Sequence, residues 1–371
     1  MTKTYDVAVI GAGVFGAWTA YWLRRAGAEV LLIDAYGPGN SRASSGGESR
    51  MIRLGYGPDE IYTRWAQRSL DLWKKLFEEA GPQTVSLFQN TGILWLAREQ
   101  DPYCEAVLTT LQRTGTRFEK LDRGELVHRF PQIDPGQATW GILEPDSGVL
   151  MARRAVQAVV AQARGISVDY VQARVTTDSR INADRLVFAC GPWLPKIFPQ
   201  LLGELIHVTR QEVLFFGVPA GDERFGPPAM PAWIDFNDLV YGLPNLDGRG
   251  FKLAIDAHGP EFDPDDGERV VSQAGLTAAR EYLAQRIPGL ADAPVLETRV
   301  CQYENTSNGD FLIDRHPEFD NIWIVGGGSG HGFKHGPVVG EYVTAMINGT
   351  GTPESRFSLA TKQRVQSREV Y

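Results

Sequence analysis

Short apolar runs alternate with amphipathic stretches at the start of the chain. Residues 5–10 (YDVAVI) are rich in Val and Ile and predict a short buried strand. Glycines interrupt this run over 11–16, and the apolar spacing then predicts a helix over 14–26 that ends at Gly27. Residues 30–33 predict a second buried strand. This order indicates a βαβ unit with a parallel pair of strands.

The same α/β rhythm returns in the middle and at the end of the chain, with different patterns between. Helices are predicted over 61–76, 155–164, 276–287 and from 332 to about 347, and strands over 166–171, 185–190 and 321–325. The stretch 35–57 predicts an extended loop, 85–143 mixes strand-like and helix-like pieces, and 207–255 predicts mostly short strands with turns. Two interleaved domains fit this order better than two consecutive ones.

Composition and charge exclude several classes of protein. A length of 371 residues fits about two domains, and a net charge of −8 without a basic cluster argues against a nucleic-acid partner. The three cysteines are widely spaced and form no CxxC pair, so neither a disulfide framework nor a zinc site is expected, and Cys104 and Cys190 are predicted to be core residues. The histidines show no metal-ligand spacing. We expect no membrane span, no signal peptide and a cytoplasmic location.

A G-x-G-x-x-G pattern lies between the first predicted strand and helix. Gly11 would allow the tight turn, Gly13 the approach of a pyrophosphate, and Gly16 the close packing of helix on strand. The helix N-terminus would then face the phosphates with its positive end. Asp34 lies 23 residues after Gly11, as expected of an acid that binds a ribose, and so favours NAD or FAD over NADP. The dinucleotide-binding residues predicted from this unit are Gly11, Gly13, Val14, Phe15, Gly16 and Asp34.

Four parts of the chain resemble the monomeric sarcosine oxidase and N-methyltryptophan oxidase branch of the D-amino-acid-oxidase-like FAD-dependent oxidoreductases. They are the glycine unit with Asp34; GESRMIR at 47–53, followed by Tyr56-Gly57; EPDSGVL at 144–150; and, near the C-terminus, CQY at 301–303, DFLID at 310–314 and SGHGFK at 329–334. Their order and spacing extend the resemblance over nearly the whole chain.

The resemblance implies an α/β (α+β) fold and a covalent cofactor. A Rossmann-like FAD-binding domain would comprise residues 1–80, 144–202 and 300–371, and a substrate domain on a mixed or antiparallel sheet would comprise 81–143 and 203–299. FAD would be linked through its 8α-methyl carbon to Cys301. A thiolate is the attacking form of a cysteine, so a depressed thiol pKa would help this attachment.

Several further residues take their roles from the same resemblance. Arg53 and Lys334 would anchor the substrate carboxylate, for which a bidentate guanidinium and a nearby ammonium are suited. Arg50 would stabilise negative charge on the reduced flavin or hold its loop. Lys252 would assist O₂, because a fixed cation stabilises the superoxide anion. Tyr303 would line the substrate pocket. The remaining flavin contacts implied are Ser44, Val175 beside the adenine, and Gly330, His331, Gly332, Phe333 and Lys334 near the flavin ring.

Asp256 departs from the family pattern, in which a histidine often occupies this position. In a regular strand, residues 252, 254 and 256 share a face, which would place Asp256 near Lys252 and the substrate. It would then contact the amine or a polar side chain of the substrate, or pair with Lys252 and weaken its charge. His258 is the alternative histidine if a bulge shifts the register.

The sequence therefore predicts FAD-dependent oxidation of a small secondary amino acid (sarcosine-like, N-methyl or cyclic) to an imine, with O₂ reduced to H₂O₂ by a monomeric enzyme. Loss of a proton from the amine must come first, so activity should rise with pH. Three alternatives remain open at this stage. They are a related flavoenzyme that acts on a primary amine or uses another electron acceptor, a nicotinamide-dependent dehydrogenase, and a flavin-binding module without catalysis.

Overall fold

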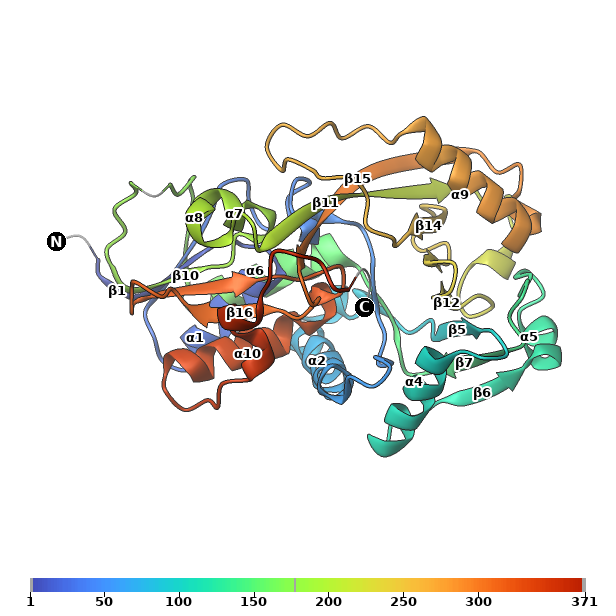
Figure 1. Cartoon of the computed structure of the whole chain (residues 1–371), viewed down its shortest axis with the longest axis horizontal. Coiled ribbons are helices and arrows are strands. Elements are labelled where there is room, and N and C mark those ends of the chain that lie inside the picture. The colour runs from blue at the N-terminus through green and yellow to red at the C-terminus, as the bar shows by residue number, and fades with distance from the viewer. Residues whose placement is uncertain (1–2, 177, 369–371) are drawn as a thin grey trace.

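A computed structural model describes residues 3–176 and 178–368, and a mainly parallel sheet of six strands forms one half of it (Figure 1). Strand β16 pairs antiparallel with β17, and the other neighbours pair in parallel. In spatial order the strands are β16 (Leu312–Arg315), β17 (Ile322–Gly326), β10 (Ala183–Phe188), β1 (Tyr5–Ile10), β2 (Val30–Asp34) and β9 (Asp169–Gln172).

An eight-stranded mixed sheet forms the other half. Strands β12 and β5 pair in parallel and the remaining neighbours are antiparallel, with β11 and β15 forming a long ladder. The spatial order is β15 (Val295–Thr306), β11 (Ile206–Phe216), β14 (Phe251–Ile255), β13 (Val240–Leu243), β12 (Ala232–Asp235), β5 (Ile93–Ala97), β7 (Trp140–Glu144) and β6 (Glu119–Asp122). In the part of the chain that the structure describes, a third, small sheet is not paired with either large sheet. Its strands are, in spatial order, β3 (Arg50–Ile52), β8 (Gly148–Leu150) and β4 (Phe88–Gln89).

Helices cover the faces of both large sheets. Alternate residues of a strand point to opposite faces, so Val9 and Val187 pack with α1 and α10, while Ile10 and Phe188 join the core beside α7 and α8. In the second sheet, Leu94 and Leu253 pack against α9. The helices are α1 (Val14–Arg25), α2 (Glu60–Glu79), α3 (Pro82–Val85), α4 (Pro102–Arg113), α5 (Arg123–Arg129), α6 (Ala152–Gly165), α7 (Leu194–Ile197), α8 (Pro199–Leu202), α9 (Gln273–Arg286) and α10 (Gly336–Ile347).

The predicted α/β class and the mixed second sheet are confirmed, with local differences. The stretch 207–255 begins with the 11-residue strand β11 instead of a short one. The strand predicted from Ile166 begins only at Asp169, because Ser167 takes a positive φ of 77° in the turn that ends α6. The loop predicted over 35–57 contains strand β3 and a single helical turn, Ser44–Gly46.

The predicted domain boundaries stay a prediction. Strand β15 runs across the boundary placed at residue 300, since its first half lies on one side and its second half on the other. Within residues 3–176 and 178–368, the helices are each too short or too polar to cross a bilayer.

Candidate active site

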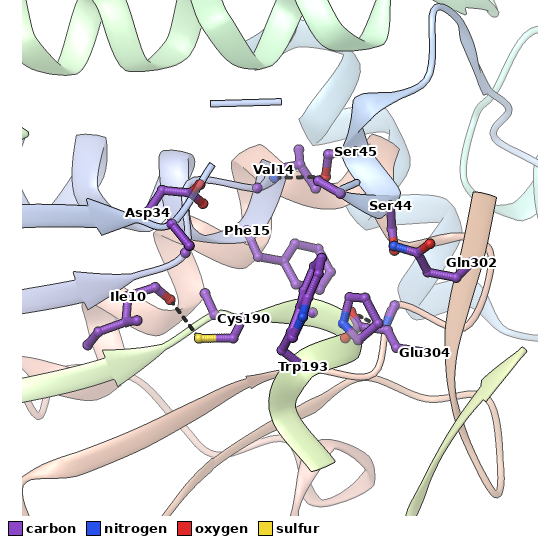
Figure 2. A pocket seen from close by; sticks show the side chains of 18 of the residues that line it. Ile10, Val14, Phe15, Asp34, Ser44, Ser45, Cys190, Trp193, Gln302 and Glu304 are labelled. Carbon is purple, nitrogen blue, oxygen red and sulfur yellow. Dashed lines mark hydrogen bonds between the residues drawn. The ribbon is translucent and has the colours of Figure 1, made fainter. Parts of the chain in front are cut away.

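A cavity of about 340 Å³ opens at the carboxyl ends of the parallel strands β1, β2 and β10 (Figure 2). Ligands of open parallel sheets bind at this edge. The wall includes residues from the start, middle and end of the chain. Of the predicted cofactor-binding residues, it contains Gly11, Gly13, Val14, Phe15, Asp34, Ser44, Arg50, Val175, Cys301, Gly330, Gly332 and Phe333.

The glycine turn after β1 leaves no room for larger side chains at two positions. Gly11 has a φ of +104°, and a Cβ added there would lie 2.3 Å from the carbonyl oxygen of Ala189. A Cβ added at Gly16 would lie 1.8 Å from the carbonyl oxygen of Gly11, so this glycine lets α1 approach the turn. Both contacts are too close for any side chain, which explains why glycine occupies the first and last positions of the G-x-G-x-x-G pattern.

Asp34 and Ser45 hold the backbone around this turn. One carboxylate oxygen of Asp34 accepts a hydrogen bond of 2.7 Å from the backbone N–H of Ala12, and the other accepts from the N–H groups of Tyr36 and Gly37. The oxygen that accepts only from Ala12 has a second lone pair, so the group can still accept from a ribose hydroxyl. The Ser45 hydroxyl accepts from the Val14 N–H at 3.0 Å.

Arg50 and Cys301 meet at the part of the cavity formed by β3 and β15. The Arg50 guanidinium donates to the Cys301 sulfur at 3.2 Å and to the Ser44 carbonyl at 3.0 Å. Both side chains are half-buried. The guanidinium thus contacts the sulfur that the resemblance assigns to the flavin linkage.

A second cavity, of about 80 Å³, adjoins the first and shares Arg50, Tyr303 and Gly330 with it. Arg53 and Lys334 line this smaller space and are both buried. They sit over one aromatic ring, since the Arg53 guanidinium carbon and the Lys334 Nζ lie 4.2 and 5.2 Å from the ring centroid of Tyr56. The structure therefore brings the two predicted carboxylate anchors together.

The surroundings of Lys334 oppose its positive charge. Burial lowers the pKa of Lys334 well below its usual value, and the positive charge of Arg53 lowers it further. The Lys334 Nζ donates to the Tyr56 hydroxyl at 2.8 Å and to the His331 carbonyl at 3.1 Å, which are neutral acceptors. A bound carboxylate would supply the negative charge that restores the ammonium form.

Glu144 supports Arg53 from behind and was given no role by the sequence. This fully buried carboxylate accepts from the backbone N–H groups of Leu54 and Gly55, at 2.7 and 2.9 Å, immediately after Arg53. It also accepts from the Trp95 indole and the Ser147 hydroxyl. Glu144 belongs to the segment 144–150, which resembles the family. Only the fold shows that Glu144 holds a loop about 90 residues away in the sequence.

Asp256 lies in the wall of the second cavity, just after the end of β14. Its carboxylate accepts a hydrogen bond of 2.6 Å from the Tyr303 hydroxyl, and His258 lies in the same wall. Burial raises the pKa of Asp256, while the bond from Tyr303 and the charge of Arg53 act in the opposite direction. Asp256 thus places a carboxyl group in the same small space as the carboxylate anchors.

Lys252 points from β14 into the space beside Arg50 and Cys301. Its Nζ is buried and donates to the Ser49 carbonyl at 2.9 Å, so Lys252 and Asp256 take different partners. Burial lowers the pKa of Lys252 well below its usual value, and Arg50 lowers it further. Negative charge developing nearby would favour protonation of this amine.

His331 lines the second cavity, with its ring stacked on Phe311 at 4.8 Å between centroids. Burial lowers the pKa of His331 well below its usual value, so the ring is neutral near pH 7. Cys190, predicted to be a core residue, instead lies half-buried in the wall of the large cavity. In the described parts of the chain, no group of three or more His, Cys, Asp or Glu side chains is placed to hold a metal ion.

The comparisons with known proteins agree with this geometry. A sequence profile of the DAO family, described as FAD dependent oxidoreductase, matches residues 6–346. Peroxisomal sarcosine oxidase of Mus musculus is 33% identical over 361 residues, which cover 92% of this chain and 91% of that protein. Monomeric sarcosine oxidase of Bacillus sp. (strain NS-129) is 30% identical over 388 residues, covering 98% of each. These matches confirm the resemblance predicted from the sequence.

The fold has a close counterpart among solved structures. The crystal structure of L-proline dehydrogenase from P. horikoshii matches with a TM-score of 0.82 and 20% sequence identity, covering 97% of this chain and 98% of that chain. The TM-score establishes that the two proteins share a fold, whereas an identity of 20% leaves the substrate to other evidence.

Proposed function

The chain belongs to the FAD dependent oxidoreductase family, and we propose that it oxidises the C–N bond of a small secondary amino acid to an imine, with O₂ reduced to H₂O₂. The observation that carries this proposal is the gathering of Arg50, Arg53 and Lys334 around the second cavity, which adjoins the larger one. Cations gathered around one small cavity favour an anionic ligand, and the carboxylate of an amino acid provides one.

The large cavity fits FAD. Asp34 and Val175 lie in its wall together with the glycine turn, as expected for the adenosine and pyrophosphate, and Arg50 and Cys301 lie in the same wall. Bound FAD would accept a hydride equivalent from the carbon next to the amine nitrogen and pass the electrons on to O₂. Cys301 would hold the flavin by a thioether bond to its 8α-methyl carbon.

The residues of the second cavity would bind and orient the substrate. Arg53 and Lys334 hold its carboxylate, and Glu144 keeps the Arg53 loop in place through the N–H groups of Leu54 and Gly55. The amine nitrogen would then lie toward Asp256 and Tyr303, which occupy the same wall. Lys252 would hold positive charge beside the position where O₂ takes up electrons.

Two measurements test this function. The purified protein is precipitated with acid, and yellow colour should stay in the pellet for the unchanged chain and be lost for Cys301→Ser. Cys190→Ser is the matched control, because Cys190 also lines the large cavity. The second measurement is H₂O₂ production from N-methyl and cyclic amino acids, with primary amino acids as comparison. A protein without flavin absorbance would contradict the proposal.

Substrate oxidation that needs an artificial electron acceptor instead of O₂ would point to the alternative, a related flavin dehydrogenase. We also propose that the enzyme is a monomer, by analogy with the Bacillus relative, whose name describes a monomer. The cytoplasmic location expected from the sequence remains part of this proposal. Sedimentation of the holoprotein at a mass near 41.0 kDa would agree with this state.

A further inference from the structure

Glu304 presents an unusual carboxylate to the large cavity. It follows Tyr303 on β15, lines the cavity, and is only 7% exposed. One oxygen, Oε1, accepts from the Gly328 N–H at 3.2 Å, whereas Oε2 has no hydrogen-bond partner within residues 3–176 and 178–368. A buried carboxylate oxygen without a donor is costly, so its place in a ligand cavity calls for a donor on the ligand.

Three glycines lie around this carboxylate. A Cβ added at Gly326 or Gly191 would lie 3.5 or 3.6 Å from Oε2, and one added at Gly328 would lie 3.3 Å from Oε1. Gly191 follows β10, Gly326 ends β17 and Gly328 follows β17. Figure 2 shows Glu304 beside the turn that carries Trp193, facing the same cavity as Ser44 and Ser45.

The negative charge of Glu304 limits which groups of a ligand could contact it. No Lys or Arg nitrogen lies within 4.0 Å of the Glu304 carboxylate in the described chain, so it is not half of an ion pair. A carboxylate repels phosphate, and the pyrophosphate already has the glycine turn and the helix N-terminus. FAD carries several groups that donate to a carboxylate: the ribityl and ribose hydroxyls, the adenine amino group and the flavin N3–H. Glu304 lies three residues after Cys301, the proposed attachment point for the flavin ring, on the same strand. This position favours the ribityl hydroxyls, because they lie between the flavin ring and the pyrophosphate.

We propose that Glu304 binds FAD by accepting a hydrogen bond from a hydroxyl of the ribityl chain, the part that joins the flavin ring to the pyrophosphate. This inference rests on the proposed flavin site and adds one cofactor-binding residue to it. The sequence predictions did not include Glu304, because nothing local marks it as buried or as lacking a donor.

The first test measures FAD affinity without the covalent bond. Flavin-free full-length Cys301→Ser is titrated with FAD, alone and with Glu304→Leu or Glu304→Gln added. Loss of a hydrogen bond to a charged acceptor should raise Kd about ten- to a hundredfold in the Leu variant. The Gln variant keeps a carbonyl acceptor and should lose less. If both variants had a Kd for FAD within about twofold of the Kd of Cys301→Ser alone, the inference would be overturned.

Thermal unfolding separates binding from a purely structural role. In flavin-free protein, Glu304→Leu should raise the melting temperature, because it removes a buried carboxylate oxygen that lacks a donor, although the same change weakens FAD binding. Asn305→Ala is the matched control: Asn305 is the next residue of β15, is fully buried, and does not line the cavity. It should lower the melting temperature with and without FAD and leave Kd unchanged. If Glu304→Leu behaves as Asn305→Ala does, the inference is wrong.

Flavin analogues test the contact from the side of the ligand. Analogues of FAD lacking the 2′-, 3′- or 4′-hydroxyl of the ribityl chain are bound to Cys301→Ser, and one of them should bind at least tenfold more weakly than FAD. In Glu304→Leu that same analogue should bind as well as FAD does. Equal FAD-to-analogue ratios in both proteins would exclude the contact. Failure of Cys301→Ser to bind any flavin would instead contradict the proposed function.

Discussion

The Arg50 guanidinium donates a hydrogen bond of 3.2 Å to the sulfur of Cys301, although the two residues lie 251 positions apart. The contact joins the small sheet to the long strand β15. For the proposed attachment of FAD at Cys301, this contact places a cation beside the attacking sulfur, where it would stabilise negative charge that develops during the reaction.

Replacing Arg50 should therefore slow covalent attachment. A hydrogen bond from a charged donor contributes roughly 1.5–3 kcal/mol, so Arg50→Met should slow attachment about tenfold or more, and Arg50→Lys less. The measurement follows acid-stable flavin with time after FAD is added to flavin-free protein. Attachment at an unchanged rate in Arg50→Met would show that the sulfur is activated by another group.

Lys252→Met should separate the two half-reactions. Removing the amine from the position proposed for O₂ reduction should slow reoxidation by about 10²–10³-fold. Reduction by substrate should change only a few fold, because Lys252 does not line the second cavity. Stopped-flow absorbance measures each step. Lys196→Met is the control, since Lys196 also lines the large cavity but is paired with Asp263 and Asp265; an equal loss there would refute a specific role.

Asp256→Asn should move the pH dependence of turnover to lower pH. A carboxylate near the substrate amine stabilises its ammonium form, and oxidation needs the neutral amine. Without that charge the amine loses its proton at lower pH, by about one pH unit for a pair within roughly 4–6 Å. The kcat profile over pH 6–10 measures the shift. Tyr303→Phe keeps the Asp256 charge and should shift the profile much less; identical profiles for Asp256→Asn and the unchanged enzyme would place the amine elsewhere.

Glu144→Gln should weaken substrate binding without touching the substrate. An amide offers one acceptor oxygen where the carboxylate serves four donors, so the loop after Arg53 loses part of its support. We expect KM to rise about ten- to a hundredfold, with a smaller change in kcat. Ser147→Ala removes one of the four bonds and should have a milder effect. A fall in kcat with constant KM would argue against this positioning role.

Glu304 should also give flavin-free protein a pH-dependent stability. Burial raises its pKa to about 7, from about 4.5 in the unfolded chain. Because the folded pKa is the higher one, this stabilising contribution is fully present below about pH 4.5 and is lost as pH rises through about 7, by roughly 3 kcal/mol. Glu304→Gln cannot titrate, so its advantage over Glu304 in urea unfolding should grow from pH 5 to pH 8. A constant difference would mean that Glu304 does not titrate in this range.

The sequence predicted the parts of the site that local pattern determines. Strand β1, helix α1 and the placement of Asp34 follow from apolar runs, glycines and a fixed spacing within one βαβ unit. Cys301 and Lys334 could be located only through the resemblance, because a single cysteine or lysine carries no pattern of its own. The structure then brought these separate segments into two adjoining cavities.

Long-range contacts account for what the sequence did not predict. The support of Arg53 by Glu144 and the missing partner of Glu304 depend on which segments meet in space. The length of β11 has a similar cause, because its alternating polar residues resemble a short surface strand until β15 pairs along all of it. The start of β9 was missed because a non-glycine residue, Ser167, adopts the left-handed turn.

Strand β15 carries three functional groups of the site, and they are divided between its two faces. Cys301 and Tyr303 alternate with Gln302 and Glu304 along β15, whose pairing with β11 fixes which side each one takes. A one-residue insertion upstream in this ladder would slide the strand and exchange the two sets. The sulfur would leave its place beside Arg50 at the same time as the phenol left the second cavity, so the proposed flavin attachment and substrate recognition would be lost together. Laboratory evolution of this enzyme therefore has far more freedom in its loops than in the length of this strand.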